Sequence, residues 1–124
     1  MEPYERFEAW KRADECVLAV YAATRSWPVE ERYGLTAEIR RAARSVPTNI
    51  VEGSAKFGNA EFRRFLDIGL GSIAEVGYLL RLAKSLGILS TEEWKKVELL
   101  RKDAARLLWL LYRSLGPRHP GARR

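Results

Sequence analysis

The stretch RAARSVPTNIVEG, residues 41–53, has the apolar spacing of a helix but carries a proline near its centre. Its small and apolar residues recur every three or four positions, as on one helix face: Ala42, Ala43, Val46 and Ile50. Pro47 removes one backbone hydrogen bond, and its ring clashes with the carbonyl of Ala43. Ser45, Thr48 and Asn49 can offer substitute partners to the freed backbone groups. The stretch therefore predicts a proline-bent helix, with a ligand-binding segment as the alternative.

Polar residues of the same stretch follow one face of the predicted helix, at spacings of four, three and four: Arg41, Ser45, Thr48 and Glu52. Glu75, further along the chain, is an isolated acid in an apolar run. A buried carboxylate needs a partner, and Arg41 or Arg44 is the natural candidate. We therefore expect a structural polar core that combines repair of the bend with an internal ion pair: Arg41, Arg44, Ser45, Asn49, Glu52 and Glu75.

Four helical patterns follow one another along the chain, at residues 4–27, about 35–57, 60–86 and about 91–115. The expected N-caps are Thr36, Asn59 and Ser90, and Ser90 forms a capping box with Glu93. No strand pattern is found, and the connections are short. The sequence therefore predicts an all-α fold, an antiparallel up-down-up-down four-helix bundle over residues 1–115, followed by a basic flexible tail at 116–124.

The pattern at residues 60–86 is apolar over more of its circumference than one core face requires. Between Phe65 and Ala83, only Asp67, Glu75 and Arg81 interrupt its two apolar stripes. A single small bundle covers one face of each helix, so the surplus favours contact between subunits. Small residues cost helix propensity, about 1 kcal/mol per glycine, and favour close packing against a neighbour. The residues concerned are Gly69, Gly71, Ser72 and Gly77.

Length and composition indicate one globular domain with its own core: 124 residues, 47% hydrophobic and 31% charged. The chain begins without an apolar signal core and charges interrupt its apolar stretches, so we expect a cytoplasmic protein without membrane spans. The single cysteine, Cys16, excludes an internal disulfide, and the single histidine, His119, lies in the predicted tail. The pattern contains no metal-ligand cluster, catalytic triad or phosphate-binding loop, so we expect no enzyme activity, cofactor or metal.

Positive charge gathers in the last third of the chain. The formal net charge is +6, and residues 87–124 carry nine Lys and Arg against four Asp and Glu. Helical spacing places four cations on one side of the last helix: Lys95, Lys102, Arg106 and Arg113. Trp109 lies on the same stripe, where it could stack on a base if exposed, and the tail adds Arg118, Arg123 and Arg124. These cations are the candidate nucleic-acid-binding residues, with a solvated face and a core tryptophan as the alternative.

Several segments occur in the order of a known family pattern: Trp27-Pro28, Tyr33-Gly34-Leu35, Ile39 to Gly53, Glu61 to Leu66, and Gly71-Ser72 with Glu75. Through these segments, the chain resembles the bacterial four-helix-bundle family of 23S rRNA intervening-sequence proteins, over about residues 5–115. The resemblance implies a ring-like homopentamer, and relatives that are encoded inside insertions in rRNA genes and have no established activity. It also implies a relationship to accessory variability proteins of diversity-generating retroelements, which bind a reverse transcriptase and nucleic acid.

Two hypotheses remain open from the sequence. The first is a non-enzymatic, oligomeric protein that binds structured RNA through the basic side of its last helix. The second is a protein-interaction scaffold whose basic face docks an acidic protein, for example a retroelement reverse transcriptase. The family pattern supplies no proven site, so the candidate residues rest on charge and spacing alone.

Overall fold

The computed structural model describes residues 1–117, and every regular element in this part of the chain is a helix. The four long helices are α1 (Glu8–Thr24), α2 (Leu35–Ser54), α3 (Asn59–Ser85) and α4 (Thr91–Ser114). Short 3-10 helices precede α1 and α2: η1 (Pro3–Arg6) and η2 (Val29–Glu31). Among the described residues, no helix is long and apolar enough to cross a membrane.

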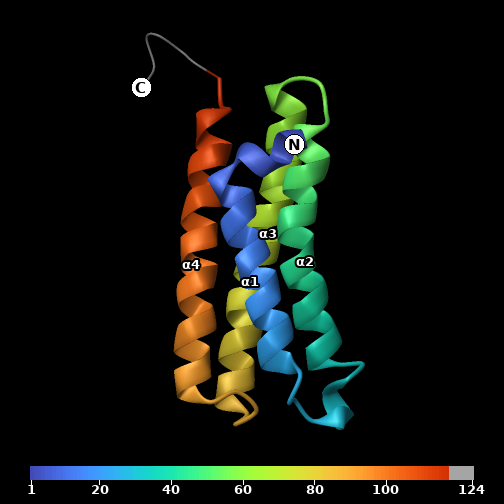
Figure 1. The fold of residues 1–124 in the computed structure, drawn as a ribbon, viewed down its shortest axis with the longest axis vertical. Helices are drawn as coiled ribbons and strands as arrows, with labels where there is room; N and C mark the ends of the chain where they lie inside the picture. Colours follow the sequence, from blue (N-terminus) through green and yellow to red (C-terminus); the bar gives the residue numbers. More distant parts are fainter. Residues whose placement is uncertain (118–124) are drawn as a thin grey trace.

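The helices form an antiparallel up-down-up-down four-helix bundle, as the sequence predicts (Figure 1). They pack as a square, in which α1 and α3 each contact both α2 and α4. The diagonal pairs, α1 with α3 and α2 with α4, have no Cα atoms within 8 Å of each other. The N-terminal segment, the α2–α3 connection and the end of α4 lie at one end of the bundle, and the other two connections lie at the opposite end. Short connections between long helices produce this order, because each helix must return beside its predecessor.

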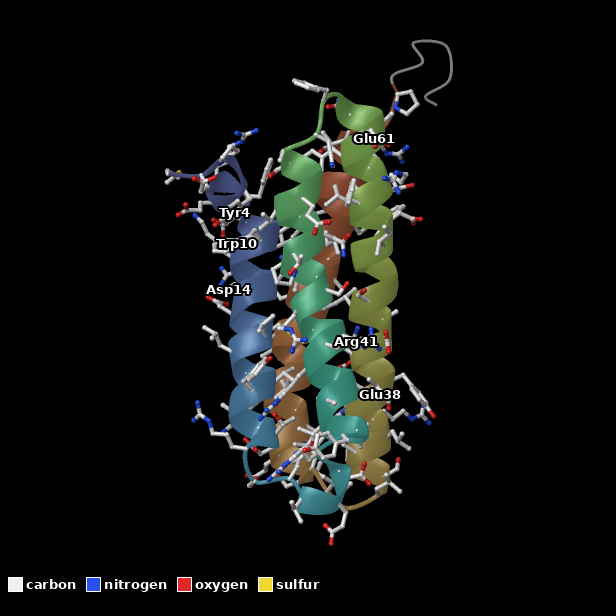
Figure 2. The ribbon with its side chains drawn as sticks, turned by 90° about the vertical axis from the view of Figure 1, so that its right-hand side faces the viewer. Tyr4, Trp10, Asp14, Glu38, Arg41 and Glu61 are labelled. Carbon is white, nitrogen blue, oxygen red and sulfur yellow. The ribbon has the colours of Figure 1, made fainter. Side chains whose placement is uncertain are left out.

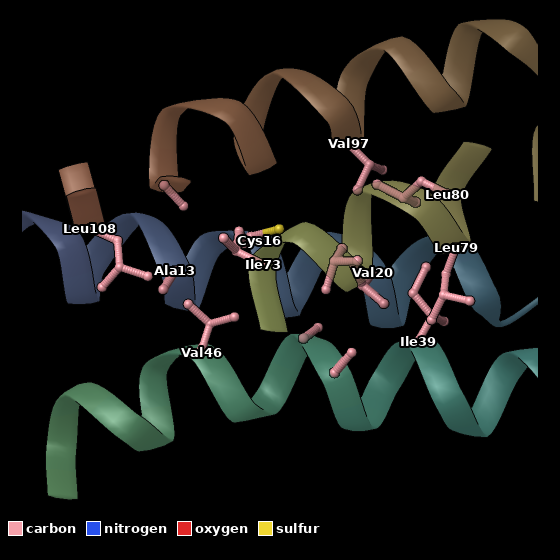
Figure 3. Close-up of a cluster of buried hydrophobic side chains, with 14 of the residues drawn as sticks. Ala13, Cys16, Val20, Ile39, Val46, Ile73, Leu79, Leu80, Val97 and Leu108 are labelled. Atoms are coloured by element: carbon pink, nitrogen blue, oxygen red, sulfur yellow. The ribbon is translucent and has the colours of Figure 1, made fainter. Parts of the chain in front are cut away.

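One continuous core fills the centre of the bundle with side chains from all four helices (Figure 3). Residues 41–53 supply the core face of α2 through Ala42, Ala43, Val46 and Ile50, each at most 1% exposed. Full burial of a valine, leucine or isoleucine side chain contributes about 1.5–3 kcal/mol. The helical spacing of the stretch therefore predicts its buried face correctly.

The first helix is shorter than predicted at both ends, while the second begins at Leu35 as expected but with a different cap. Phe7 is extended, with φ −86° and ψ 124°, and it separates η1 from α1, which ends at Thr24. At the start of α2, the carboxylate of Glu31 accepts the backbone N–H of Leu35 at 3.1 Å. Thr36 is a buried residue within α2 and not its N-cap. A side chain from the preceding connection therefore takes the capping role assigned to the threonine.

The later connections depend on a glycine and a serine. α2 ends at Ser54, earlier than predicted, and Gly58, with φ 83°, occupies the N-cap position of α3 in place of Asn59. This left-handed conformation carries no steric penalty for glycine. At α4 the Ser90 hydroxyl accepts the Glu93 N–H at 3.1 Å, which is one half of the predicted capping box.

Glycine permits a close approach of α2 and α3 at the end of the 41–53 stretch. A Cβ atom at Gly53 would lie 2.8 Å from Phe62 Cδ1 and 2.9 Å from Phe65 Cβ, too close for alanine. Of the α3 glycines expected to pack closely, Gly77 does so, because a Cβ there would lie 2.6 Å from an arginine of α4, while a Cβ at Gly69 would make an ordinary contact of 3.4 Å with a leucine. Gly71 is different: it is exposed, and no atom lies within 4 Å of a Cβ built there. Gly71 therefore makes no close approach to another helix of the bundle.

Candidate nucleic-acid interface

The predicted ion pair between α2 and α3 forms, but at the surface of the bundle. Arg41 Nη2 lies 3.1 Å from Glu75 Oε2, and the two side chains are 59% and 39% exposed. Figure 2 shows Arg41 on the outside, where α2 and α3 meet. Arg44, the alternative partner, is also exposed and donates to the Tyr21 hydroxyl at 2.6 Å. An exposed pair contributes only about 0–1 kcal/mol, so the expectation of a buried charge pair was wrong.

The buried part of the predicted polar core is a small network between α2 and α3. Asn49 is 9% exposed, and its Nδ2 donates to the Ser45 carbonyl at 2.7 Å and to Ser45 Oγ at 3.0 Å. Ser45 Oγ and Ser72 Oγ share a hydrogen bond of 2.8 Å across the two helices. Thr48 and Glu52 are exposed. Of the predicted polar core, only Asn49 is buried, with Ser45 half-buried beside it.

The largely buried ion pair of the bundle lies within α4 instead. Arg101 donates to both carboxylate oxygens of Glu98, at 2.7 and 2.6 Å, and the side chains are 16% and 13% exposed. Arg101 Nη1 also lies 3.4 Å from the Ile73 carbonyl of α3. The hydrogen bond to Glu98 raises the pKa of Arg101, while burial raises the pKa of the Cys16 thiol to about 11. The sequence could have indicated this ion pair, because Glu98 and Arg101 lie three residues apart and are next to Val97 of the core stripe.

The four predicted cations of α4 form one exposed row: Lys95, Lys102, Arg106 and Arg113. Among the described residues, no carboxylate lies within 4.0 Å of the charged groups of Lys95, Lys102 or Arg113. Arg106 Nη2 lies 2.9 Å from Asp103 Oδ1, and Asp103 also pairs with Arg12 of α1. At about 1.5 Å per residue, the row extends for about 27 Å along the helix. Most of its charge is therefore open to an anionic partner.

Trp109 lies on the same side of α4 and is 49% exposed. Its ring stacks on Tyr112, with centroids 5.7 Å apart and planes inclined by 24°. Arg63 of α3 fixes this tyrosine, because its Cζ lies 4.0 Å from the ring centroid and its Nε donates to the Tyr112 carbonyl at 3.2 Å. The indole is thus supported by the bundle while half of it stays open, an arrangement suited to stacking on a base.

Two leucines on this side of α4 were missed in the sequence. Leu99 is 71% exposed and Leu110 is 44% exposed. Each follows a cation of the row by four residues, Lys95 and Arg106 respectively, and this spacing could have identified them. We call the combined surface the α4 outer face: Lys95, Leu99, Lys102, Arg106, Trp109, Leu110 and Arg113. It mixes positive charge with apolar area.

The remaining predicted cations, Arg118, Arg123 and Arg124, lie outside the described residues, as does most of the predicted tail. Within residues 1–117, no group of three or more His, Cys, Asp or Glu is placed to hold a metal ion. The α4 outer face is therefore the part of the predicted interface whose geometry is known.

A similar bundle occurs in a protein with unknown function from the S23 ribosomal protein family of Bacteroides thetaiotaomicron. The two chains share 19% sequence identity and a TM-score of 0.75, over 84% of this chain and 97% of that chain, which shows a common fold. A search of curated proteins finds no match. The family model for the 23S rRNA-intervening sequence protein matches residues 5–109, which include the 41–53 stretch and most of α4. The chain therefore belongs to the family of 23S rRNA-intervening sequence proteins.

Proposed function

We propose that this protein is a non-enzymatic, oligomeric nucleic-acid-binding protein that contacts structured RNA through the α4 outer face. The observation that carries the proposal is an exposed row of Lys95, Lys102 and Arg113 beside a half-exposed Trp109 on one helix face. Among the described residues, no carboxylate lies within 4.0 Å of these three charged groups. Lysine and arginine rows bind phosphates and release counterions, which gives salt-dependent affinity. Because this row lies on a straight, well-packed helix, its spacing is fixed before binding.

Trp109 favours RNA that combines paired and unpaired segments. Stacking requires a base that is not already stacked in a helix, as in a loop, bulge or end. The cations on either side of the tryptophan, Arg106 and Arg113, can contact the flanking phosphates. A stem with an adjoining loop offers both elements at once. Relatives carry the name 23S rRNA-intervening sequence protein, and rRNA segments are therefore the first RNAs to test.

Self-association is part of the proposal and rests on α3. Ile68 is 46% exposed and Tyr78 is 62% exposed, and the open Gly71 lies between them on the same helix. Apolar area and a small residue on one face favour close contact with another copy of the chain. The family resemblance points to a homopentamer. Sedimentation analysis tests this part separately, because a species of 14.2 kDa would be the monomer.

A protein-interaction scaffold is the second candidate. Leu99 and Leu110 favour it, since exposed leucines on the α4 outer face contribute nothing to phosphate binding. An acidic protein with an apolar patch would match the face, and a retroelement reverse transcriptase is one example. Pull-down with and without nuclease separates the two candidates, because a partner that stays bound after nuclease treatment contacts the protein directly.

The test of RNA binding compares two variants with the same change in net charge. One carries glutamine at Lys95, Lys102, Arg106 and Arg113, and the control carries glutamine at Lys11, Arg41, Arg64 and Arg81 on the other three helices. Affinity for a stem–loop RNA is measured at about 50 and 200 mM salt. We expect weaker binding at high salt and a loss in the α4 variant only. Equal losses in both variants, or affinity indifferent to salt, would refute the proposed interface.

A further inference from the structure

A cavity of about 190 Å³ lies at the corner where α1 leads into α2. Its lining combines three arginines with polar and aromatic side chains: Thr24, Arg25, Trp27, Arg32, Thr36 and Arg40. None of these residues belongs to α4. The cavity is therefore separate from the α4 outer face, and the inference drawn from it does not depend on the proposed function.

The arginines of this cavity have no acidic partner. Among the described residues, no carboxylate lies within 4.0 Å of the guanidinium groups of Arg25, Arg32 or Arg40. Arg40 is half-buried, its Nε donates to Thr24 Oγ1 at 2.8 Å, and its Cζ lies 4.6 Å from the Tyr21 ring centroid. These contacts hold the guanidinium in place without neutralising it. Partial burial of an unpaired cation costs free energy, which a bound anion would offset.

The neighbouring acids of the α1–α2 connection do not supply that counter-charge. Glu31 directs its carboxylate to the N-terminus of α2, where Oε1 accepts the Leu35 N–H at 3.1 Å. Neither Glu30 nor Glu31 lines the cavity. The positive charge of the three arginines is therefore left for a ligand.

Two buried polar groups of the lining also lack partners. Trp27 and Thr36 are each 8% exposed, and within the described part of the chain Trp27 Nε1 and Thr36 Oγ1 form no hydrogen bond. Each atom has less than 1 Å² of accessible surface, so both lie behind the lining, and a ligand in the cavity meets the arginines first. The indole N–H and the guanidinium groups can only donate, and the threonine hydroxyl can donate as well. A lining rich in donors calls for a ligand with several acceptor oxygens.

We propose that this cavity binds a phosphate group, either free phosphate or the phosphate of a nucleotide monoester. A phosphate presents three or more acceptor oxygens and close to two negative charges, which match the three arginines of the lining. Arginine can bind such an oxyanion through two parallel N–H donors. The volume also suffices, since a water molecule takes up about 30 Å³ of liquid and the cavity has room for an oxyanion beside ordered water.

The indole N–H of Trp27 reports on occupancy, because Trp27 lines the cavity and its resonance responds to a charge bound there. Its resonance in a proton–nitrogen correlation spectrum is identified by its absence in a Trp27→Phe variant, and it is followed while inorganic phosphate or a nucleoside 5′-monophosphate is added. Sodium chloride at the same ionic strength is the reference. We expect a saturable shift of this resonance with phosphate and none with chloride. Tighter binding of the nucleotide identifies a nucleotide as the ligand, and equal binding identifies the free anion.

A matched pair of double variants connects the readout to the cavity. Arg25→Gln with Arg32→Gln removes two exposed cations of the lining, so the fold should persist. Lys11→Gln with Arg64→Gln makes the same charge change on α1 and α3, outside both the cavity and the α4 outer face. We expect the first pair to weaken phosphate affinity about tenfold or more and the second to leave it unchanged. The proposal would be overturned if both double variants bound phosphate with the same affinity. It would also be overturned if the Trp27 resonance did not shift when phosphate is added.

Discussion

The guanidinium of Arg101 in α4 covers the backbone of Gly77 in α3, so closely that a Cβ at Gly77 would lie 2.6 Å from Arg101 Cζ. The same guanidinium holds both oxygens of Glu98, and its Nη1 lies 3.4 Å from the Ile73 carbonyl. A glycine, a buried ion pair and a helix carbonyl thus form one connected contact between α3 and α4. The glycine is required by an arginine, and not by the close approach of two backbones.

This contact predicts opposite effects of alanine at two glycines of the same helix. In the monomer, Gly71→Ala should stabilise the fold by about 0.5–1 kcal/mol, because the position is open within one chain and alanine favours helix. Gly77→Ala should lower the free energy of unfolding by about 1 kcal/mol, since displacing Arg101 outweighs the same gain. Urea unfolding measures both. If Gly77→Ala stabilises as much as Gly71→Ala, Arg101 moves aside freely and the contact has no energetic weight.

The two ion pairs of the bundle should respond very differently to loss of the arginine. Arg101→Met leaves the 13% exposed Glu98 unpaired and should cost about 3 kcal/mol. Arg41→Met leaves Glu75 at the surface and should cost about 0–1 kcal/mol. Chemical denaturation of the two variants gives the comparison. Similar losses in both would mean that burial does not set the strength of these pairs.

The buried thiol of Cys16 predicts a loss of stability in alkaline solution. Burial raises the pKa of Cys16 from 9.0 to about 11, so between these pH values the folded state keeps a proton that the unfolded state has lost. The contribution of the thiol to stability is full below the unfolded pKa and declines by about 2–3 kcal/mol as pH rises through this window. Unfolding measured across the window should show a steeper decline in the native protein than in Cys16→Ala. Parallel curves would exclude a buried thiol with this pKa.

Periodicity predicted the core of the bundle well, because a helix with one apolar stripe has only one face to bury. Ala42, Val46 and Ile50 are examples, each at most 1% exposed. Periodicity also placed the α4 cations on one side. In both cases the information lies within a single helix, so neighbouring positions along the chain suffice.

The exposure of Glu75 and the cavity at the α1–α2 corner could not be predicted in this way. An acid within an apolar run is buried or exposed according to how near the next helix lies, and Glu75 lies at the surface beside α2, with a side chain that is 39% exposed. The cavity depends on the path of the connection between Thr24 and Leu35, which no repeating pattern describes. The Glu98–Arg101 pair could have been predicted from the sequence, because the two residues lie three positions apart beside the core stripe.

Trp109 offers the sharpest distinction between RNA and protein as the partner of the α4 outer face. Trp109→Ala should weaken binding of a stem–loop RNA by about 1–3 kcal/mol, while Trp109→Phe should retain part of the stacking. Leu99→Ala removes a side chain that is 71% exposed and should leave RNA affinity unchanged. Binding of a protein partner should instead be weakened more by Leu99→Ala than by Trp109→Ala, because the partner would cover the leucine.

Stability provides the control for this comparison. Trp109 is 49% exposed and its main contact is the stack on Tyr112, so its removal should cost about 0.5–1.5 kcal/mol of folding free energy and leave the helices intact by circular dichroism. A folded Trp109→Ala protein with native RNA affinity would show that the cations bind RNA without a stacked base. If Trp109→Ala and Leu99→Ala both abolish binding of a protein partner while RNA affinity is unchanged, the α4 outer face is a protein-interaction surface.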